Sequence, residues 1–102
     1  PIGPVIVTKD EIADPHNLKI FCRVNGITKQ DSNTGYMLFK IAEIIATLSR
    51  AMPLEAGDII ATGTPSGVGF ARNPPEYLHP GDIVECEVEK IGVLRNQIGS
   101  IR

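Results

Sequence analysis

One loop of this chain concentrates residues that suit the binding of an anionic ligand. Residues 62–69 read Thr-Gly-Thr-Pro-Ser-Gly-Val-Gly. Glycines let a backbone approach a ligand closely, and backbone amides beside a threonine hydroxyl can hold a carboxylate or an oxyanion. The competing interpretation is a tight structural turn, which spacing alone favours because Gly and Pro clusters are mostly turns. No Gly-Lys-Ser/Thr string follows, so this is not a nucleotide-binding phosphate loop.

A run of alternating glutamates is the second cluster with possible chemistry. Glu85, Glu87 and Glu89 are two residues apart, so in a strand their side chains project from one face. Three aligned carboxylates could hold a divalent cation. We favour the alternative, a solvated face of a half-buried sheet, because such alternation is the usual pattern of antiparallel strands.

The histidines and cysteines give weaker signals. His16 and His79 lie in loops beside prolines, and we expect surface residues at both positions. A catalytic base is the alternative for His16. Cys22 and Cys86 fall on the predicted apolar faces of strands, so we expect buried structural thiols rather than reactive ones.

The elements that would position these groups follow from periodicity and turn chemistry. Alternation predicts a strand over residues 19–24, and the Asn-Gly pair at 25–26 predicts a hairpin turn into a second strand over 27–30. A 3.6-residue repeat of apolar side chains predicts one main helix near residues 41–51.

The string Leu-x-x-Gly-Asp-Ile occurs twice, at residues 54–59 and 78–83, and each copy predicts a turn that feeds a strand. The predicted strands outside the hairpin cover residues 5–8, 58–62, 82–90 and 93–98. With about seven strand segments, one helix and no strand-helix-strand alternation, we expect a β-rich α+β domain rather than a parallel doubly wound sheet.

Composition limits the partners and the compartment. The formal net charge is -2 and the basic residues are scattered, so we expect no nucleic-acid partner. No apolar run is long enough to span a bilayer, so we expect no membrane partner. Two cysteines without Cys-x-x-Cys spacing and without an apolar leader indicate a reducing cytoplasm. The opening at Pro1, directly before an apolar run, suggests a start in mid-sequence.

Seven strings together resemble one family. In chain order they are Gly3-Pro4-Val5-Ile6-Val7-Thr8, Asp14-Pro15 with Leu18, Val24-Asn25-Gly26, Gln30 with Ser32-Asn33-Thr34, Gly57-Asp58-Ile59-Ile60, the loop from Thr62 to Gly69, and Pro80-Gly81-Asp82. Their order is similar to that in the catalytic domain of the fumarylacetoacetate hydrolase superfamily. The resemblance covers essentially the whole chain.

The resemblance implies that residues 1–102 form the C-terminal portion of that catalytic domain, with a mixed β-roll fold and a homodimeric assembly. It implies a metal-dependent enzyme acting on small keto or dicarboxylic acids. Its reaction would be carbon-carbon bond hydrolysis, decarboxylation or keto-enol isomerisation in aromatic or amino-acid catabolism. The family's Mg²⁺, Mn²⁺ or Ca²⁺ is bound by a Glu-x-Glu pair and an Asp that precede the Gly-Pro string, as does its active-site lysine. We therefore assign no metal ligand and no catalytic residue within the chain.

Thr64 is the residue that carries over by motif, because it resembles the family's substrate-contacting threonine. Gly63 would line the same pocket by adjacency. The resemblance implies that the metal acts as a Lewis acid on the keto-acid oxygens while Thr64 orients the substrate carboxylate or carbonyl. The alternatives are a catalytically inert fold remnant acting as a binding or dimerisation module, and an unrelated small β-barrel.

Overall fold

The computed structural model describes residues 1–3 and 5–100. Within these residues the chain forms four strands, one α-helix and three short 3-10 helices. The strands are β1 (Lys19–Val24), β2 (Ile27–Asn33), β3 (Ile83–Val88) and β4 (Gly92–Gln97). The helices are α1 (Ile41–Ala51) and the 3-10 helices η1 (Lys9–Glu11), η2 (Thr34–Tyr36) and η3 (Gly69–Ala71).

The four strands form one sheet in the order β2-β1-β3-β4, and every neighbouring pair is antiparallel. The hairpin between β1 and β2 turns at Asn25 and Gly26, whose φ angles are 52° and 78°. Two positive φ angles in succession are the requirement of a type I′ turn, which is why the Asn-Gly pair predicts this hairpin correctly.

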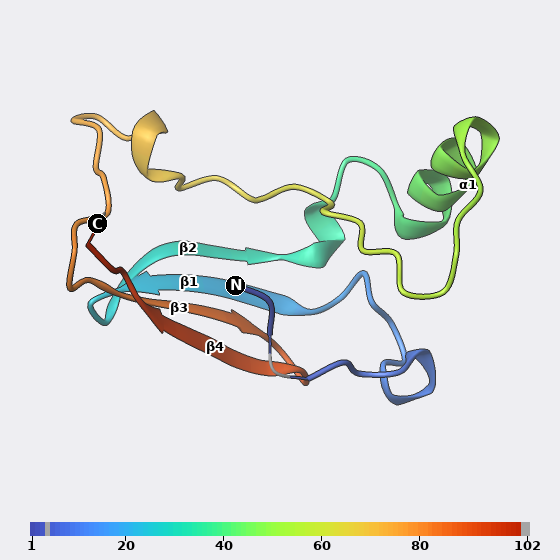
Figure 1. The fold of residues 1–102 in the computed structure, drawn as a ribbon, viewed down its shortest axis with the longest axis horizontal. Coiled ribbons are helices and arrows are strands. Elements are labelled where there is room, and N and C mark those ends of the chain that lie inside the picture. Colours follow the sequence, from blue (N-terminus) through green and yellow to red (C-terminus); the bar gives the residue numbers. More distant parts are fainter. Residues whose placement is uncertain (4, 101–102) are drawn as a thin grey trace.

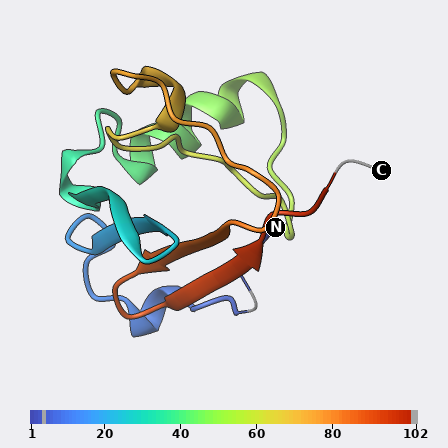
Figure 2. The same ribbon diagram turned by 90° about the vertical axis from the view of Figure 1, so that its left-hand side faces the viewer.

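The long connection between β2 and β3 leaves the sheet and returns to it. Figure 1 shows α1 beyond one end of the sheet, with the subsequent chain running back above the strands. In the perpendicular view of Figure 2, this connection, coloured green to orange, forms a layer on one side of the sheet. The described side chains leave the space between the layers partly open, and the buried apolar side chain among them is Leu18, which is 4% exposed.

The fold class predicted from the sequence is confirmed, and most predicted elements lie where expected. The strand over 19–24 and the helix over 41–51 have the predicted bounds, while β2 extends three residues beyond the prediction. The strands predicted over 82–90 and 93–98 are present as β3 and β4.

Two predicted strands are wrong. Residues 5–8 and 58–62 are irregular, so the described residues form four strands instead of about seven. A strand exists only where a neighbour completes its backbone hydrogen bonds, and neither segment pairs with the outer strands β2 and β4, whose free edges could have accepted one. Pro4, part of the Gly-Pro string, lies outside the described residues.

Candidate substrate site

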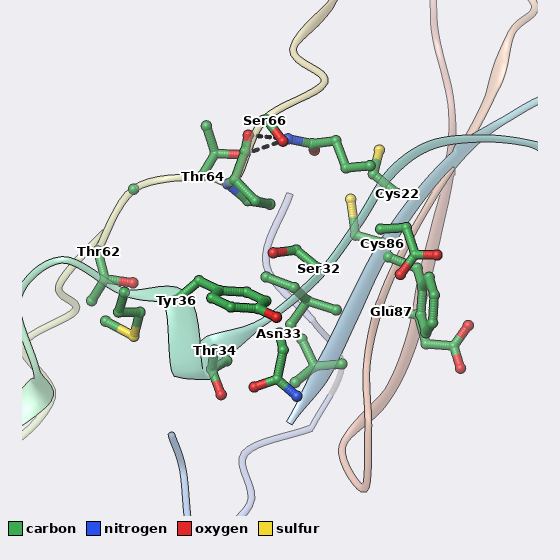
Figure 3. A pocket seen from close by; sticks show the side chains of 18 of the residues that line it. Cys22, Ser32, Asn33, Thr34, Tyr36, Thr62, Thr64, Ser66, Cys86 and Glu87 are labelled. Atoms are coloured by element: carbon green, nitrogen blue, oxygen red, sulfur yellow. Dashed lines mark hydrogen bonds between the residues drawn. The ribbon is translucent and has the colours of Figure 1, made fainter. Parts of the chain in front are cut away.

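The loop from Thr62 to Ser66 forms one wall of an open pocket whose floor is the sheet (Figure 3). The pocket encloses about 930 Å³, which is within the size range of small-molecule sites. Residues that line it from the loop are Thr62, Gly63, Thr64, Pro65 and Ser66, and those from the sheet include Ile20, Cys22, Gln30, Ser32, Cys86, Glu87 and Val88. The structure therefore brings the loop singled out in the sequence to a concave surface.

Gln30 of β2 holds Thr64 in place. Its side-chain Nε2 donates hydrogen bonds to Thr64 Oγ1 at 2.9 Å and to the Pro65 carbonyl at 2.7 Å. A carbonyl oxygen only accepts, so the group of Gln30 that faces the loop must be its NH₂. Thr64 Oγ1 consequently accepts from Gln30, and the threonine's own hydrogen is free to point at another acceptor. Thr64 lines the pocket and keeps a hydroxyl hydrogen that it can donate to a ligand.

A β-bulge in β2 makes this docking possible. In the β1–β2 ladder Cys22 pairs with Gln30 while Arg23 pairs with Thr28, which leaves Lys29 as the extra residue. The Lys29 carbonyl therefore turns out of the ladder and accepts a hydrogen bond from Arg72 Nη2. Bulges next to functional sites re-aim the groups of one strand. The bulge is a feature of the site that the sequence analysis missed, because no residue type in 27–30 marks it.

Glycine is required where the loop meets the bulge. Gly67 has φ of 102°, and a Cβ atom at this position would lie 2.2 Å from the Lys29 carbonyl oxygen. Arg72 Nε also donates to the Gly67 carbonyl at 3.2 Å, which fixes the loop from the other side. Gly63 has the same φ of 102° but no atom within 4 Å of its missing Cβ. Gly67 is therefore needed for close packing, and Gly63 for backbone conformation alone.

The three aligned glutamates are an ion-paired face. Arg23 Nε lies 3.6 Å from Glu85, and Arg23 Nη2 pairs with Glu87. Arg95 Nε lies 3.5 Å from the other oxygen of Glu85, and Glu89 accepts a hydrogen bond from the Lys19 backbone. Among the described residues, no three His, Cys, Asp or Glu side chains form a group that could hold a metal ion. Within these ion pairs Glu85 and Glu87 are half-buried, and Glu89 is exposed.

The two histidines have structural roles. Half-buried His16 accepts a hydrogen bond at Nε2 from the backbone N–H of Ile41, the first residue of α1, at 3.1 Å. Its ring thus satisfies one of the unpaired donors at the start of the helix. His79 is exposed, and its backbone N–H donates to Asp82 in the turn before β3. Neither residue lines the pocket beside Thr64.

The prediction that both cysteines are buried is wrong. Cys22 is half-buried and Cys86 is exposed, and both are free thiols. They do lie on the apolar face of the sheet, but that face is the floor of the open pocket rather than a closed core. Figure 3 shows both sulfur atoms on the pocket side of the strands.

Comparison with known proteins assigns the chain to a family. Residues 1–99 match the family model described as "Fumarylacetoacetate (FAA) hydrolase C-terminal". The chain belongs to the fumarylacetoacetate hydrolase family. It is 56% identical over 98 residues to the oxaloacetate tautomerase FAHD2A, mitochondrial, of Bos taurus, which covers 96% of this chain and 31% of that protein. The chain thus spans about a third of the length of the curated relatives it matches.

Solved structures of similar proteins share the fold. The fumarylacetoacetate hydrolase from psychrophilic Exiguobacterium antarcticum matches with a TM-score of 0.95 and 48% identity, over 99% of this chain and 36% of its own. A maleylpyruvate hydrolase from Sphingobium sp. SYK-6, in complex with manganese (II) ion and pyruvate, matches with a TM-score of 0.90. It is 36% identical, over 100% of this chain and 36% of its own.

The described part of the chain offers no metal site. The described residues do not fit the divalent cation of the fumarylacetoacetate hydrolase family, since they contain no suitable ligand group. No chemical step is therefore assigned to an ion in this part of the chain.

Across residues 1–3 and 5–100, no helix has the length and apolar character that crossing a membrane requires.

Proposed function

We propose that this chain supplies the substrate-side loop of an enzyme that interconverts the keto and enol forms of a small 2-oxo dicarboxylic acid such as oxaloacetate. The observation that carries the proposal is the Thr64 hydroxyl, which lines the pocket, accepts a hydrogen bond from Gln30 and so keeps its own hydrogen for another acceptor. The name of the bovine relative, an oxaloacetate tautomerase 56% identical to this chain, supports the choice of reaction.

The proposed role of Thr64 follows from where charge develops in tautomerisation. When a proton leaves the carbon next to the 2-oxo group, negative charge gathers on the carbonyl oxygen. A donor already aimed at that oxygen, or at the adjoining carboxylate, stabilises the enolate without having to reorganise. Gly63 lines the same pocket and gives the substrate access to the backbone beside Thr64. We propose no residue of this chain as the general base that removes the proton.

The remaining components of the enzyme are part of the same proposal. A divalent cation would act as a Lewis acid on the substrate oxygens, and the manganese (II) and pyruvate in the maleylpyruvate hydrolase support this. Its ligands are proposed to lie outside residues 1–102. We also propose a homodimer. A cytoplasmic location stays a prediction from cysteine usage, and the bovine relative is named mitochondrial.

The test is the rate of oxaloacetate enol conversion by the purified full-length protein with Mn²⁺, followed by the ultraviolet absorbance of the enol. Thr64→Ala removes the donor and is expected to lower kcat/KM by about 100-fold, the usual cost of losing one oxyanion donor. Thr64→Ser keeps the hydroxyl and is the matched control, for which we expect near-normal kinetics.

Three outcomes would contradict the proposal in different ways. Unchanged kinetics in Thr64→Ala would remove Thr64 from the site. Hydrolysis of maleylpyruvate without enol conversion would keep the family chemistry but change the reaction. The absence of turnover and of Mn²⁺ binding by the full-length protein would favour the catalytically inert binding or dimerisation module.

A further inference from the structure

Cys22 and Cys86 are directly opposite each other on neighbouring antiparallel strands, β1 and β3. The ladder places hydrogen bonds on both sides of them, from Glu89 N to Lys19 O at 2.9 Å and from Asn25 N to Ile83 O at 2.8 Å. Hydrogen-bonded pairs alternate along an antiparallel ladder, so the positions bonded in this way are 19, 21, 23 and 25. Position 22 therefore forms a non-hydrogen-bonded pair with position 86.

This kind of pair has the spacing that a disulfide needs. In non-hydrogen-bonded pairs the Cα atoms are about 4.5 Å apart and the side chains approach each other closely. Disulfides join residues with Cα atoms roughly 4.4–6.8 Å apart. Figure 3 shows the two sulfur atoms on the same side of the sheet. The register of the two strands therefore suits a disulfide between these thiols.

The environment of the two thiols sets how they would react. Burial, and then the neighbouring Cys86, raise the pKa of the Cys22 thiol, so at neutral pH Cys22 is protonated and a weak nucleophile towards solutes. Cys86 is exposed and lines the open pocket, so it is the thiol that a dissolved oxidant meets first. Cys22, the half-buried thiol, is then directly opposite Cys86 and can form the disulfide with it.

We propose that Cys22 and Cys86 form a reversible dithiol–disulfide site on the floor of the Thr64 pocket, oxidised by a low-molecular-weight disulfide such as glutathione disulfide. The Cys86 thiolate attacks one sulfur of glutathione disulfide and releases one glutathione thiol. Cys22 then gives up its proton to solvent, and the resulting thiolate attacks the Cys86 sulfur and releases the second glutathione as a thiolate, which takes up a proton. Two protein thiols and one glutathione disulfide thus give one protein disulfide and two glutathione thiols.

The location gives this modification a direct path to the substrate loop. Cys22 pairs with Cys86 on one side and with Gln30 on the other, and Gln30 is the residue that holds Thr64. In a reducing compartment the two cysteines are free thiols. Under more oxidising conditions the disulfide forms next to Gln30, the residue that holds the Thr64 loop. The inference does not depend on the proposed reaction, because the covalent change can be measured without any substrate.

The test is a peptide map of the native full-length protein after titration with glutathione disulfide. Remaining thiols are blocked at low pH, and the protein is digested with trypsin without reduction. We expect a disulfide-linked pair of the peptides 20–23 and 73–90, which carry Cys22 and Cys86, and its disappearance after dithiothreitol. Glutathione attached to Cys86 without a cross-link, or both cysteines still free, would overturn the proposal.

Cys22→Ser is the matched variant, since it removes the resolving thiol and keeps the size of the side chain. In this variant we expect glutathione to accumulate on Cys86 without a cross-linked peptide. A Cys86 that stays free in Cys22→Ser under the same titration would contradict the order of the two steps. If the variant fails to fold, the wild-type peptide map still decides between a cross-linked pair and two independent thiols.

Discussion

The two copies of Leu-x-x-Gly-Asp-Ile form the same turn but lead to different structures. In the first copy Asp58 accepts from the Glu55 backbone at 2.8 Å, and in the second Asp82 accepts from the His79 backbone at 2.8 Å. The glycines before these aspartates have φ angles of 100° and 94°. The six-residue string therefore determines the turn by itself.

The structure beyond each turn depends on neighbours that the string does not contain. The second copy leads into β3, which pairs with β1 and β4. Asp82 also accepts a hydrogen bond from Asn25 Nδ2 at 2.8 Å, which fixes this turn to the β1–β2 hairpin. The first copy leads into the irregular residues 58–62, where Ile59 is 75% exposed. The difference shows that a turn is a local property and a strand is not.

The irregular segment after the first copy is the one that reaches the candidate site. Gln30 and the bulge at Lys29 hold it to β2 further along, at residues 64–67. Because no ladder occupies this backbone, its groups are available to a ligand. The second copy thus leads into the central sheet, and the first leads into the loop of the candidate site.

The largest effect is expected from breaking the contact that holds the loop. Gly67→Ala would put a Cβ atom 2.2 Å from the Lys29 carbonyl at a φ of 102°. We expect a loss of about 3 kcal/mol in the free energy of unfolding, measured by urea denaturation, from overpacking and backbone strain together.

Gly63→Ala is the matched control for Gly67→Ala. It has the same φ of 102° but open space around the new Cβ, so it should cost only about 1 kcal/mol. Equal losses in the two variants would show that the loop is not packed against the bulge.

The next effect compares the two aspartates. Asp82→Ala removes the bonds to His79 and Asn25, whereas Asp58→Ala removes the turn bond to Glu55. We expect Asp82→Ala to lower Tm, followed by circular dichroism, by more than Asp58→Ala does. A larger drop in Asp58→Ala would mean that the first copy is the better anchored turn.

Low pH should weaken the stabilisation that the Asp82 carboxylate gives to the second turn. The backbone hydrogen bond from His79 and then the side-chain bond from Asn25 lower the pKa of Asp82. A lowered pKa means that the stabilisation is fully present above the ordinary aspartate pKa and is lost as pH falls through the lowered value. The Tm difference between the wild type and Asp82→Asn should therefore shrink at acid pH, and a constant difference would count against these bonds.

The smallest difference is expected between the two turn glycines. Gly57 and Gly81 have φ angles of 100° and 94°, and neither has an atom within 4 Å of its missing Cβ. Gly57→Ala and Gly81→Ala should each cost about 1 kcal/mol, because only the backbone conformation opposes the methyl group. Clearly unequal losses in urea denaturation would contradict the view that the two turns are locally the same.

The sequence predicts the features whose causes are local. Asn25 and Gly26 specify their own turn, and the apolar repeat of residues 41–51 specifies the helix, so both are found where predicted. Residues 58–62 alternate like a strand, but among the described residues no strand pairs with them, and their own sequence does not show whether a partner exists. The sequence also does not predict the contact of His16 with Ile41, which joins residues 25 positions apart.

Some residues of the candidate site can likewise be predicted from the sequence, and others cannot. The Gly-Thr-Pro string indicates Thr64 and Gly63 because glycine and threonine in a loop have a chemical use of their own. The part played by Gln30 depends on the bulge at Lys29, which only the paired strands reveal. The exposure of Cys86 depends equally on which layer lies over the sheet.

The central claim is that Gln30 acts through Thr64, and a double-mutant cycle tests it most directly. The measurement is kcat/KM for enol conversion in the full-length wild type, Gln30→Ala, Thr64→Ala and the double variant. We expect each single change to lower kcat/KM and Gln30→Ala to add little once Thr64 is gone, a coupling of about 1–2 kcal/mol. Fully additive losses would show that Gln30 and Thr64 act independently and would contradict the account.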